Sequence, residues 1–347
     1  LQFRVIDEAV EASPTNQYQG DLWGLYLAIE QPDGRFLKAR ELPDGNLYKM
    51  YFPCSANPTN MNNQGPSQVT DHSDVQAFWN AYRAYPSSRQ WWQDTVNLPL
   101  YYSYRLICDA VHHYDLSDAW NILYYHHPDT QRWWALPWDF DHSWDTDIYT
   151  HDDEYWKQVL APRFFQGHRV THPNIYHEFP DCIIAFQNRA RELQDLLINQ
   201  DQCVQLINDC AAIIADPQGG PSFVDVDRAM WDRHPRTRDK GSYYASSPTG
   251  DFAGMVERMR AFISPKGWGY ENIARIARDA RIPDTPDISY TGAPGYTGNA
   301  LSFASTAFVS PQGNNRFEAQ QWRIAEMDPR TPGLYEIEAL WESLNST

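Results

Sequence analysis

Two short aromatic strands followed at once by two aspartates are the feature that most constrains how this chain can fold. Residues 120–125 and 133–136 are rich in Trp, Tyr and Leu, and Pro128-Asp129 between them is typical of a turn. We therefore predict a β-hairpin whose second strand leads into Asp139 and Asp141. If the extended backbone continues, side chains two residues apart lie on one face, so both carboxylates could hold one divalent cation.

Aliphatic and aromatic runs separated by Asp-Gly turns predict a small antiparallel sheet near the beginning of the chain. Lys38 and Lys49 would then lie on successive strands of this sheet. Residues 54–71 are rich in Asn, Pro, Ser and Gly, and we expect them to form a loop. The expected strands are residues 22–30, 35–38 and 46–51.

Apolar residues at helical spacing predict helices before and after the hairpin. Ser73 and Asp74 could cap the first of these helices, and residues 100–111 form the second. Further helices are expected at residues 181–198, 202–215, 251–263 and 269–281. The pattern indicates an α+β fold with a sheet-bearing N-terminal part and a helical C-terminal lobe. Pro and Gly residues mark 283–299 as a linker, and 300–347 read as part of a β-rich module.

The composition limits the partners and the cellular setting. The chain has 28 basic and 45 acidic residues and a net charge of −17, which disfavours nucleic acid as a partner. An acidic surface instead suits divalent cations or a basic protein substrate. No apolar run reaches the roughly 18 residues of a membrane-spanning helix, and no targeting signal is visible. The five cysteines lack metal-binding spacing and are expected in the core, with a disulfide between two of them left open.

Polar residues around the hairpin match the needs of phosphoryl transfer. A kinase site uses one Asp to orient the attacking hydroxyl, and an Asn and an Asp to hold the metal ions. Asp115 precedes the hairpin, Asn121 lies at the start of its first strand, and Asp139 and Asp141 follow its second strand, which is the order that such a site uses. An Asp-x-Asp pair alone is also typical of a solvated turn, but the tryptophans on either side of this pair favour a half-buried cleft.

The strand lysines are candidates for contact with nucleotide phosphates. A lysine on a strand near the nucleotide can neutralise the α- and β-phosphates, and a glutamate can hold that lysine in place. Lys49 with Glu30 behind it are the candidates for these roles, and Lys38 competes with Lys49.

Four segments of the chain are informative when they are taken together. They are Gly24-Leu25-Tyr26-Leu27-Ala28-Ile29-Glu30-Gln31-Pro32, Phe36-Leu37-Lys38, Gly45-Asn46-Leu47-Tyr48-Lys49 and Leu136-Pro137-Trp138-Asp139-Phe140-Asp141. In this order they resemble the CotH family of spore-coat-type kinases, which look like distant, atypical relatives of protein kinases. The resemblance implies a kinase-like fold over residues 1–282, lacking its N-terminal strands, followed by the linker and the β-rich module.

The resemblance also implies an activity. It implies ATP and Mg²⁺ or Mn²⁺ as cofactors, and transfer of phosphate to Ser or Thr of a basic or Ser/Thr-rich protein substrate. The substrate would be a secreted or cell-surface protein, and this bacterial chain would act outside the cell or at its surface. Asp139 would be the principal metal ligand, with Asp141 beside it and Asn121 on the hairpin, and Asp115 would orient the hydroxyl.

Departures from the family pattern leave other functions open. No Gly follows the Asp-Phe pair, no Gly-rich phosphate loop is present, and Trp120 stands where relatives often have a basic residue. Asp109 and Asp118 compete with Asp115 for the orienting role. One alternative function is a glycoside hydrolase that pairs Asp139 with Asp115 and binds sugar on tryptophan platforms. The other is a catalytically inactive, kinase-like surface scaffold.

Overall fold

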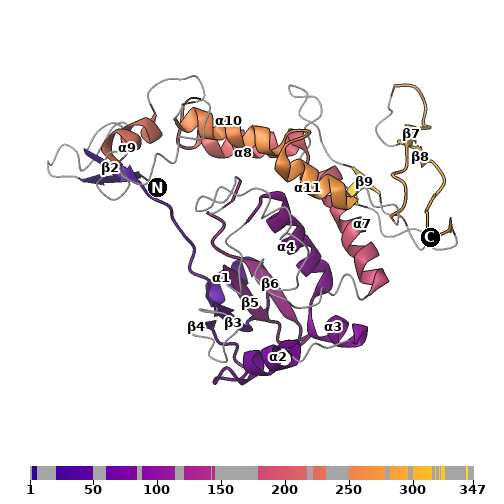
Figure 1. Cartoon of the computed structure of the whole chain (residues 1–347), viewed down its shortest axis with the longest axis horizontal. Helices are drawn as coiled ribbons and strands as arrows, with labels where there is room; N and C mark the ends of the chain where they lie inside the picture. Colours follow the sequence, from indigo (N-terminus) through magenta and orange to yellow (C-terminus); the bar gives the residue numbers. More distant parts are fainter. Residues whose placement is uncertain are drawn as a thin grey trace.

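A four-stranded antiparallel sheet lies at the centre of the fold that the computed structural model gives this chain (Figure 1). Its strand order is β4 (Asn60–Asn63), β3 (Asn46–Lys49), β5 (Ile122–His126) and β6 (Trp133–Pro137). The predicted hairpin is confirmed, with Leu123 opposite Leu136 and Tyr124 opposite Ala135. β4 was missed, because it lies within the polar range expected to form a loop. The structure describes residues 2–5, 21–49, 60–83, 88–113, 121–141, 143–144, 179–216, 222–231, 249, 251–277, 282–295, 300–314, 317, 320, 322–324 and 341–342.

Both faces of this sheet are buried, since side chains alternate between the faces along each strand. Tyr48 and Tyr124 point into the larger hydrophobic core. Leu47 and Leu123 point into a smaller core on the opposite face. Every residue of β5 is therefore buried, which explains why its sequence is continuously apolar rather than alternating.

Three helices cover the face that holds the larger core. They are α2 (Ser73–Arg83), α3 (Arg89–Thr95) and α4 (Leu98–Ala110). Trp79 of α2 meets Tyr124 edge-on, with ring centroids 5.6 Å apart. α2 and α4 confirm two sequence predictions, whereas α3 was missed because Trp92 is the one residue it buries. A bridge between Val96 and Trp133 places the beginning of α4 next to the beginning of β6.

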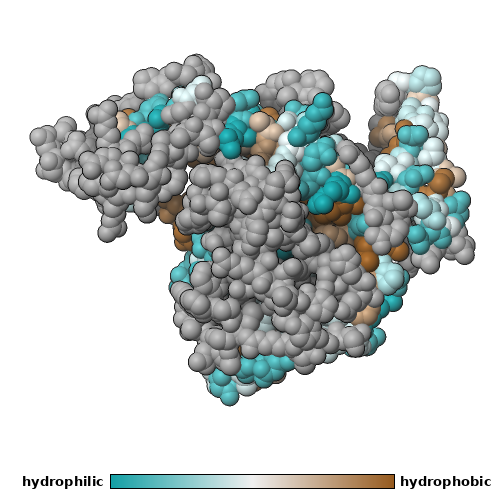
Figure 2. All heavy atoms as spheres, in the orientation of Figure 1, coloured by the Kyte–Doolittle hydropathy of each residue, from teal (hydrophilic) through white to brown (hydrophobic). Residues whose placement is uncertain are grey.

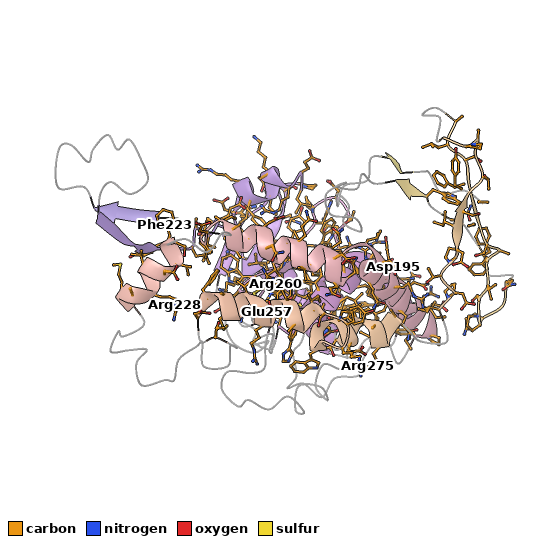
Figure 3. All side chains as sticks on the ribbon, turned by 90° about the horizontal axis from the view of Figure 1, so that it is seen from above. Asp195, Phe223, Arg228, Glu257, Arg260 and Arg275 are labelled. Carbon is orange, nitrogen blue, oxygen red and sulfur yellow. The ribbon has the colours of Figure 1, made fainter. Side chains whose placement is uncertain are left out.

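A second group of helices runs past the sheet-bearing part (Figure 1). They are α7 (Pro180–Leu196), α8 (Gln200–Ala212), α10 (Phe252–Ile263) and α11 (Trp268–Ala277), and they confirm four predicted helices. α7 and α11 pack against α4, so the two helix groups share the larger core. Figure 3 shows α8 and α10 side by side, with Arg260 at their interface, where its Nε donates to Asn208 Oδ1 at 2.9 Å. None of the described helices has the length and apolar character needed to cross a bilayer.

The first strands form a small sheet of their own. It consists of β1 (Gln2–Val5) and β2 (Asp21–Leu25), and it packs against α9 (Phe223–Trp231). The Leu25 amide donates to Asp227 Oδ1 at 2.9 Å. The strand predicted over 22–30 therefore ends at Leu25, and the prediction was wrong beyond it. Leu27 is 84% exposed, because this part of the segment packs against no strand in the described part of the chain.

The segment that contains Lys38 is a helix, α1 (Gly34–Ala39), and not the predicted strand. Asp33 caps this helix, since its side chain accepts hydrogen bonds from the amides of Arg35 (2.8 Å) and Phe36 (3.3 Å). The sequence prediction assigned Asp33 to a turn, although Asp favours turns and helix N-caps for the same reason. Lys38 therefore lies exposed in the last turn of α1 and not on a strand of the sheet that carries Lys49.

The end of the chain contains two small sheets. One pairs β7 (Ile288–Tyr290) with β8 (Phe303–Ser305), and the other pairs β9 (Arg323–Ile324) with β10 (Trp341–Glu342). β7 lies inside the range expected to be a linker, so that expectation was wrong for these residues. In Figure 2 hydrophobic and hydrophilic residues alternate over the β7–β8 region, where Ile288 and Phe303 are exposed. The division into a kinase-like domain and a β-rich module stays a prediction.

The described cysteines carry free thiols. Cys108, Cys182 and Cys203 are buried, as expected for core residues. Cys210 is exposed, so the expectation that the cysteines lie in the core was wrong for this residue. Its neighbours Asp209 and Asn208 in the last part of α8 are exposed as well, because this end of the helix meets solvent.

A buried polar network ties α2 to the sheet. The Asp74 carboxylate accepts hydrogen bonds from the Tyr48 hydroxyl at 2.6 Å and from Asn46 Nδ2 at 3.1 Å. It also lies 2.9 Å from Nδ1 of His126, whose ring stacks on Trp133 with centroids 4.4 Å apart. Burial alone raises the pKa of Asp74, but the hydrogen bonds from His126, Tyr48 and Asn46 outweigh it and hold that pKa below its usual value.

Replacement of Asp74 by Asn is expected to lower the free energy of unfolding by about 2 kcal/mol at pH 7, because one of the two accepting oxygens becomes an NH2 donor and the negative charge is lost. The folded pKa of Asp74 lies below the unfolded one, so the carboxylate's contribution is present above about pH 4 and is lost as the pH falls further. Urea unfolding at a series of pH values measures both effects. Asp94→Asn, an exposed change on α3, is the control and should be nearly neutral; an equal loss in both variants would contradict this role.

Candidate functional site

The ends of three strands meet at one edge of the central sheet. In the β3–β5 register Lys49 lies opposite Leu123, and in the β5–β6 register Ile122 lies opposite Pro137. Lys49 therefore ends β3 at the edge where Asn121 enters β5 and where β6 releases the chain toward Asp139. The structure thus brings three predicted site residues to one edge, although they are far apart in the sequence.

Both ends of the hairpin are shaped by a left-handed backbone conformation. Asn121 has φ 57° and Asp139 has φ 61°, a region that Asn and Asp tolerate better than most residues. The backbone after Pro137 is therefore not extended, and the prediction that strand alternation would align Asp139 with Asp141 was wrong. Asn121 is buried, whereas both aspartates are exposed.

The segment that follows β6 packs on the end of α4. The Phe140 ring stacks on the His113 imidazole, with centroids 4.2 Å apart and planes 19° apart, and meets Tyr104 edge-on at 6.4 Å. The Trp144 amide donates to the Val111 carbonyl at 2.6 Å. These contacts bind the residues on both sides of Asp141 to the end of α4, so the position of the aspartates depends on this helix.

The end of α4 is itself held by α11. Asn272 Nδ2 donates to the Asp109 carbonyl at 3.1 Å. A Cβ atom on Gly269 would lie 2.4 Å from the Ala110 carbonyl oxygen, so only glycine allows the two helices to approach this closely. The packing of α11 therefore contributes to the position of the residues that follow α4.

Lys49 contacts an aromatic ring rather than the predicted glutamate. Its Nζ lies 4.8 Å from the centroid of the Trp138 ring. Glu30 forms an ion pair with Arg40, with Oε2 and Nη2 2.9 Å apart, and both side chains are about half exposed. The prediction that Glu30 holds Lys49 in place is therefore wrong, because Glu30 pairs with Arg40 instead. Lys38 lies on α1, as described above, and does not share the strand position of Lys49.

Asp115 and its competitor Asp118 lie outside the described residues, and their orienting role stays a prediction. His113, which precedes Asp115 by two residues, was not predicted as a site residue. A His-x-Asp spacing before an Asn is the pattern of a kinase catalytic loop, and this signal could have been found in the sequence.

Asp109, the other competitor, is engaged within α4. Arg105 Nη2 lies 3.0 Å from Asp109 Oδ1, and each side chain is 3% exposed. The pair is close, but Asp109 Oδ1 has no hydrogen bond of good geometry among the described residues. Burial therefore outweighs the guanidinium and raises the pKa of Asp109 to about 6. A carboxylate enclosed in this way has no access to a protein hydroxyl.

The oxygen donors at the sheet edge fit a hard divalent cation. Among the described residues no three His, Cys, Asp or Glu side chains gather into a metal-binding group. Mg²⁺ does not need such a group, since one or two carboxylates and the phosphates of a substrate usually hold it. Asp139 and Asp141, which are exposed, and the amide of Asn121 would provide this donor set.

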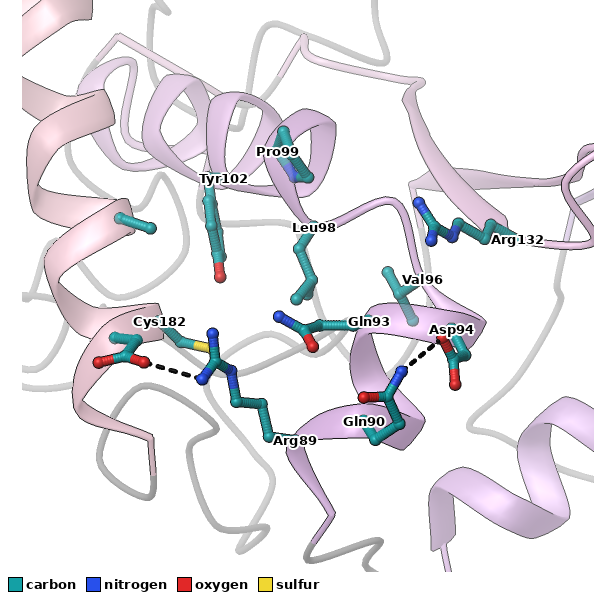
Figure 4. Close-up of a pocket in the computed structure, with 12 residues that line it drawn as sticks. Arg89, Gln90, Gln93, Asp94, Val96, Leu98, Pro99, Tyr102, Arg132 and Cys182 are labelled. Carbon is teal, nitrogen blue, oxygen red and sulfur yellow. Dashed lines mark hydrogen bonds and ion pairs between the residues drawn. The ribbon is translucent and has the colours of Figure 1, made fainter. Parts of the chain in front are cut away.

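A separate pocket of about 430 Å³ lies at the opposite end of α4, between α3, α4 and α7 (Figure 4). Arg89 forms an ion pair with Asp181 there at 2.8 Å, and Arg132 lies on the other side of the pocket. α4 has 13 residues, and a helix rises about 1.5 Å per residue, so the pocket is remote from the sheet edge. It is not part of the candidate site.

Comparison with known proteins identifies one matching family. The family described as CotH kinase protein matches residues 12–265, which include every predicted site residue. The match ends before α11 and the last strands. No curated protein gave a significant match.

The stack of Phe140 on His113 is expected to stabilise the fold measurably. In a double-mutant cycle of Phe140→Leu and His113→Leu, the coupling free energy should be about 1 kcal/mol, as for other ring pairs. Leucine keeps an apolar side chain in each position, so the cycle isolates the ring contact. Urea unfolding of the four proteins measures the coupling, and a value near zero would show that the two segments are held independently.

Because the pKa of Asp109 is raised, its contribution to the free energy of unfolding should change with pH in the direction opposite to that of Asp74. The folded state binds a proton more tightly than the unfolded state, so this group's contribution is complete below about pH 4. It is lost as the pH rises through about 6. The stability of Asp109→Asn relative to the unsubstituted chain should therefore increase between pH 4 and 7 in urea titrations. A difference that is constant or decreases over this range would contradict the burial argument.

Proposed function

Because the chain belongs to the CotH kinase protein family, we propose that it transfers a phosphoryl group from ATP to a Ser or Thr hydroxyl of a protein. The observation that carries this proposal is the meeting of Lys49, Asn121 and Asp139 at one edge of the sheet. Phosphoryl transfer depends mainly on positioning and charge neutralisation, so a cation and oxygen ligands at one edge are its central requirement. The proposal includes a kinase-like fold for the matched part of the chain.

In this proposal Asp139, Asp141 and Asn121 would hold Mg²⁺ or Mn²⁺. The bound metal ion would neutralise the charge of the transferring phosphoryl group and of the oxygens next to it. Asn121 is buried, whereas both aspartates are exposed. Asp139 has a left-handed backbone conformation two residues after β6 ends, and its side chain is exposed.

Lys49 would bind the nucleotide phosphates. It extends from the face of the smaller core, at the end of β3, and its ammonium already lies near the segment of Asp139. Glu30, which pairs with Arg40, has no part in this role. Trp138 contacts the lysine, with its ring centroid 4.8 Å from Lys49 Nζ.

Asp115 would orient the attacking hydroxyl and accept its proton. His113, two residues before it, is fixed by the Phe140 ring. The same ring lies next to Asp139 in the sequence, so one contact couples the hydroxyl-orienting loop to the metal-binding segment. This coupling supports the choice of Asp115 over Asp109, which is enclosed by Arg105.

The substrate is proposed to be a secreted or cell-surface protein with a basic or Ser/Thr-rich segment. A chain with a net charge of −17 attracts a basic segment over distances comparable to the Debye length, about 8 Å at physiological salt. The location outside the cell comes from the family resemblance alone.

The glycoside hydrolase alternative relies on tryptophan platforms. The tryptophan side chains that the structure describes are buried or half-buried. Trp79, Trp92 and Trp133 are buried in the larger core. The aromatic content of these residues is therefore explained by packing.

Asp139→Asn should lower the rate of phosphate transfer from labelled ATP by roughly a hundredfold or more, because one charged ligand becomes neutral. Asp129→Asn is the matched control, since it makes the same change at the other end of the hairpin and should leave transfer unaffected. The assay uses Mg²⁺ or Mn²⁺ and a mixed protein substrate, and melting temperatures of both variants check the fold.

Undiminished transfer by Asp139→Asn would refute the assignment of the metal site. Binding of ATP without transfer by the unsubstituted chain would favour the inactive scaffold. Release of sugar without ATP would favour the glycoside hydrolase.

A further inference from the structure

Trp138 is placed against Lys49 by the geometry of the sheet. Lys49 lies opposite Leu123, and Leu123 lies opposite Leu136, so these three side chains leave the same face of the sheet. Trp138 follows Leu136 by two residues and packs against the same smaller core. Its ring lies 4.8 Å from Lys49 Nζ, within the range of a cation–π contact.

The burial of the indole edge indicates that the face of this ring is the functional part. Trp138 Nε1 is buried, and no described residue accepts a hydrogen bond from it. A donor buried without an acceptor destabilises the fold, and a phenylalanine ring would avoid this loss. Trp, however, attracts a cation over its face more strongly than Phe does. The contact with Lys49 is therefore the physical reason to have tryptophan at this position.

We propose that Trp138 is a positioning residue for Lys49, whose ammonium it holds at the sheet edge beside Asn121 and Asp139. The lysine stem is long and flexible, and its freedom is lost when the ammonium binds a phosphate. The ring restricts the stem before a ligand arrives, so less freedom is lost on binding. The ring faces one side of the ammonium, which has three N–H donors in all.

The contact can be observed in the free protein by NMR. The chain has five lysines, so selective ¹³C labelling of lysine gives few ε-methylene signals, and Lys49→Met assigns the one that matters. The Lys49 signal should be shifted upfield by the ring current of Trp138. Trp138→Leu should remove this shift, and Trp138→Phe should keep part of it. Phe36→Leu is the control, because it removes a similar contact with Arg40 (3.8 Å) from the same core and should not change the Lys49 signal.

Binding of ATP with Mg²⁺ tests the consequence, which rests on the proposed function. In titration calorimetry Trp138→Leu should weaken binding by about threefold to tenfold, and Trp138→Phe should weaken it less. In the Lys49→Met background the same substitutions should have no further effect, since Trp138 acts through the lysine. A purely structural role would weaken binding equally in both backgrounds and would overturn the inference.

The two measurements separate the possible failures. An unshifted Lys49 signal in the unsubstituted chain, or a signal that Trp138→Leu leaves in place, would refute the ring contact. A shifted signal in a chain that binds no ATP would confirm the contact and refute both the proposed function and the role of Lys49 in it.

Discussion

The ring of Phe140 lies nearly parallel to the imidazole of His113, and this contact decides where the hairpin ends relative to α4. The two rings belong to segments that are separated by the whole hairpin. α4 and β6 begin side by side at Val96 and Trp133, and the stack brings their ends together as well. The chain after Pro137 must therefore turn across the end of α4 instead of continuing as a strand.

That turn determines which polar side chains are exposed at this edge of the sheet. Asp139 takes the left-handed conformation immediately before the stacked ring, and its carboxylate is exposed while Asn121 remains buried. Lys49 reaches the same edge because β3 pairs with β5 on the other side of the hairpin. Backbone pairing thus places Lys49 at this edge, and the stack holds the segment that carries Asp139 and Asp141. Neither part depends on a Gly-rich loop, which the sequence lacks.

The sequence predicted the elements whose pattern is long and regular. The hairpin follows from its aromatic strands and its turn, and α7 and α10 follow from apolar residues at helical spacing. Asp33 was predicted in a turn but is the N-cap of α1. Its side chain can accept hydrogen bonds from backbone amides in either structure, so the sequence does not distinguish them. The conformation of Asp139 was not predictable either, since it depends on the packing of Phe140 against a distant helix. The partner of Glu30 was not predictable either, because the sequence does not show which basic side chain its carboxylate can reach in the folded chain.

The central claim is that one edge of the sheet binds the metal ion and the phosphates of a nucleotide. The most direct measurement is a crystal structure with Mn²⁺ and a non-hydrolysable ATP analogue, using anomalous scattering to locate the metal. We predict a Mn²⁺ peak within coordination distance of Asp139, roughly 2.0–2.6 Å, with phosphate oxygens next to Lys49 Nζ. A nucleotide bound in the remote pocket near Arg89, or a Mn²⁺ peak away from Asp139 and Asp141, would contradict the account.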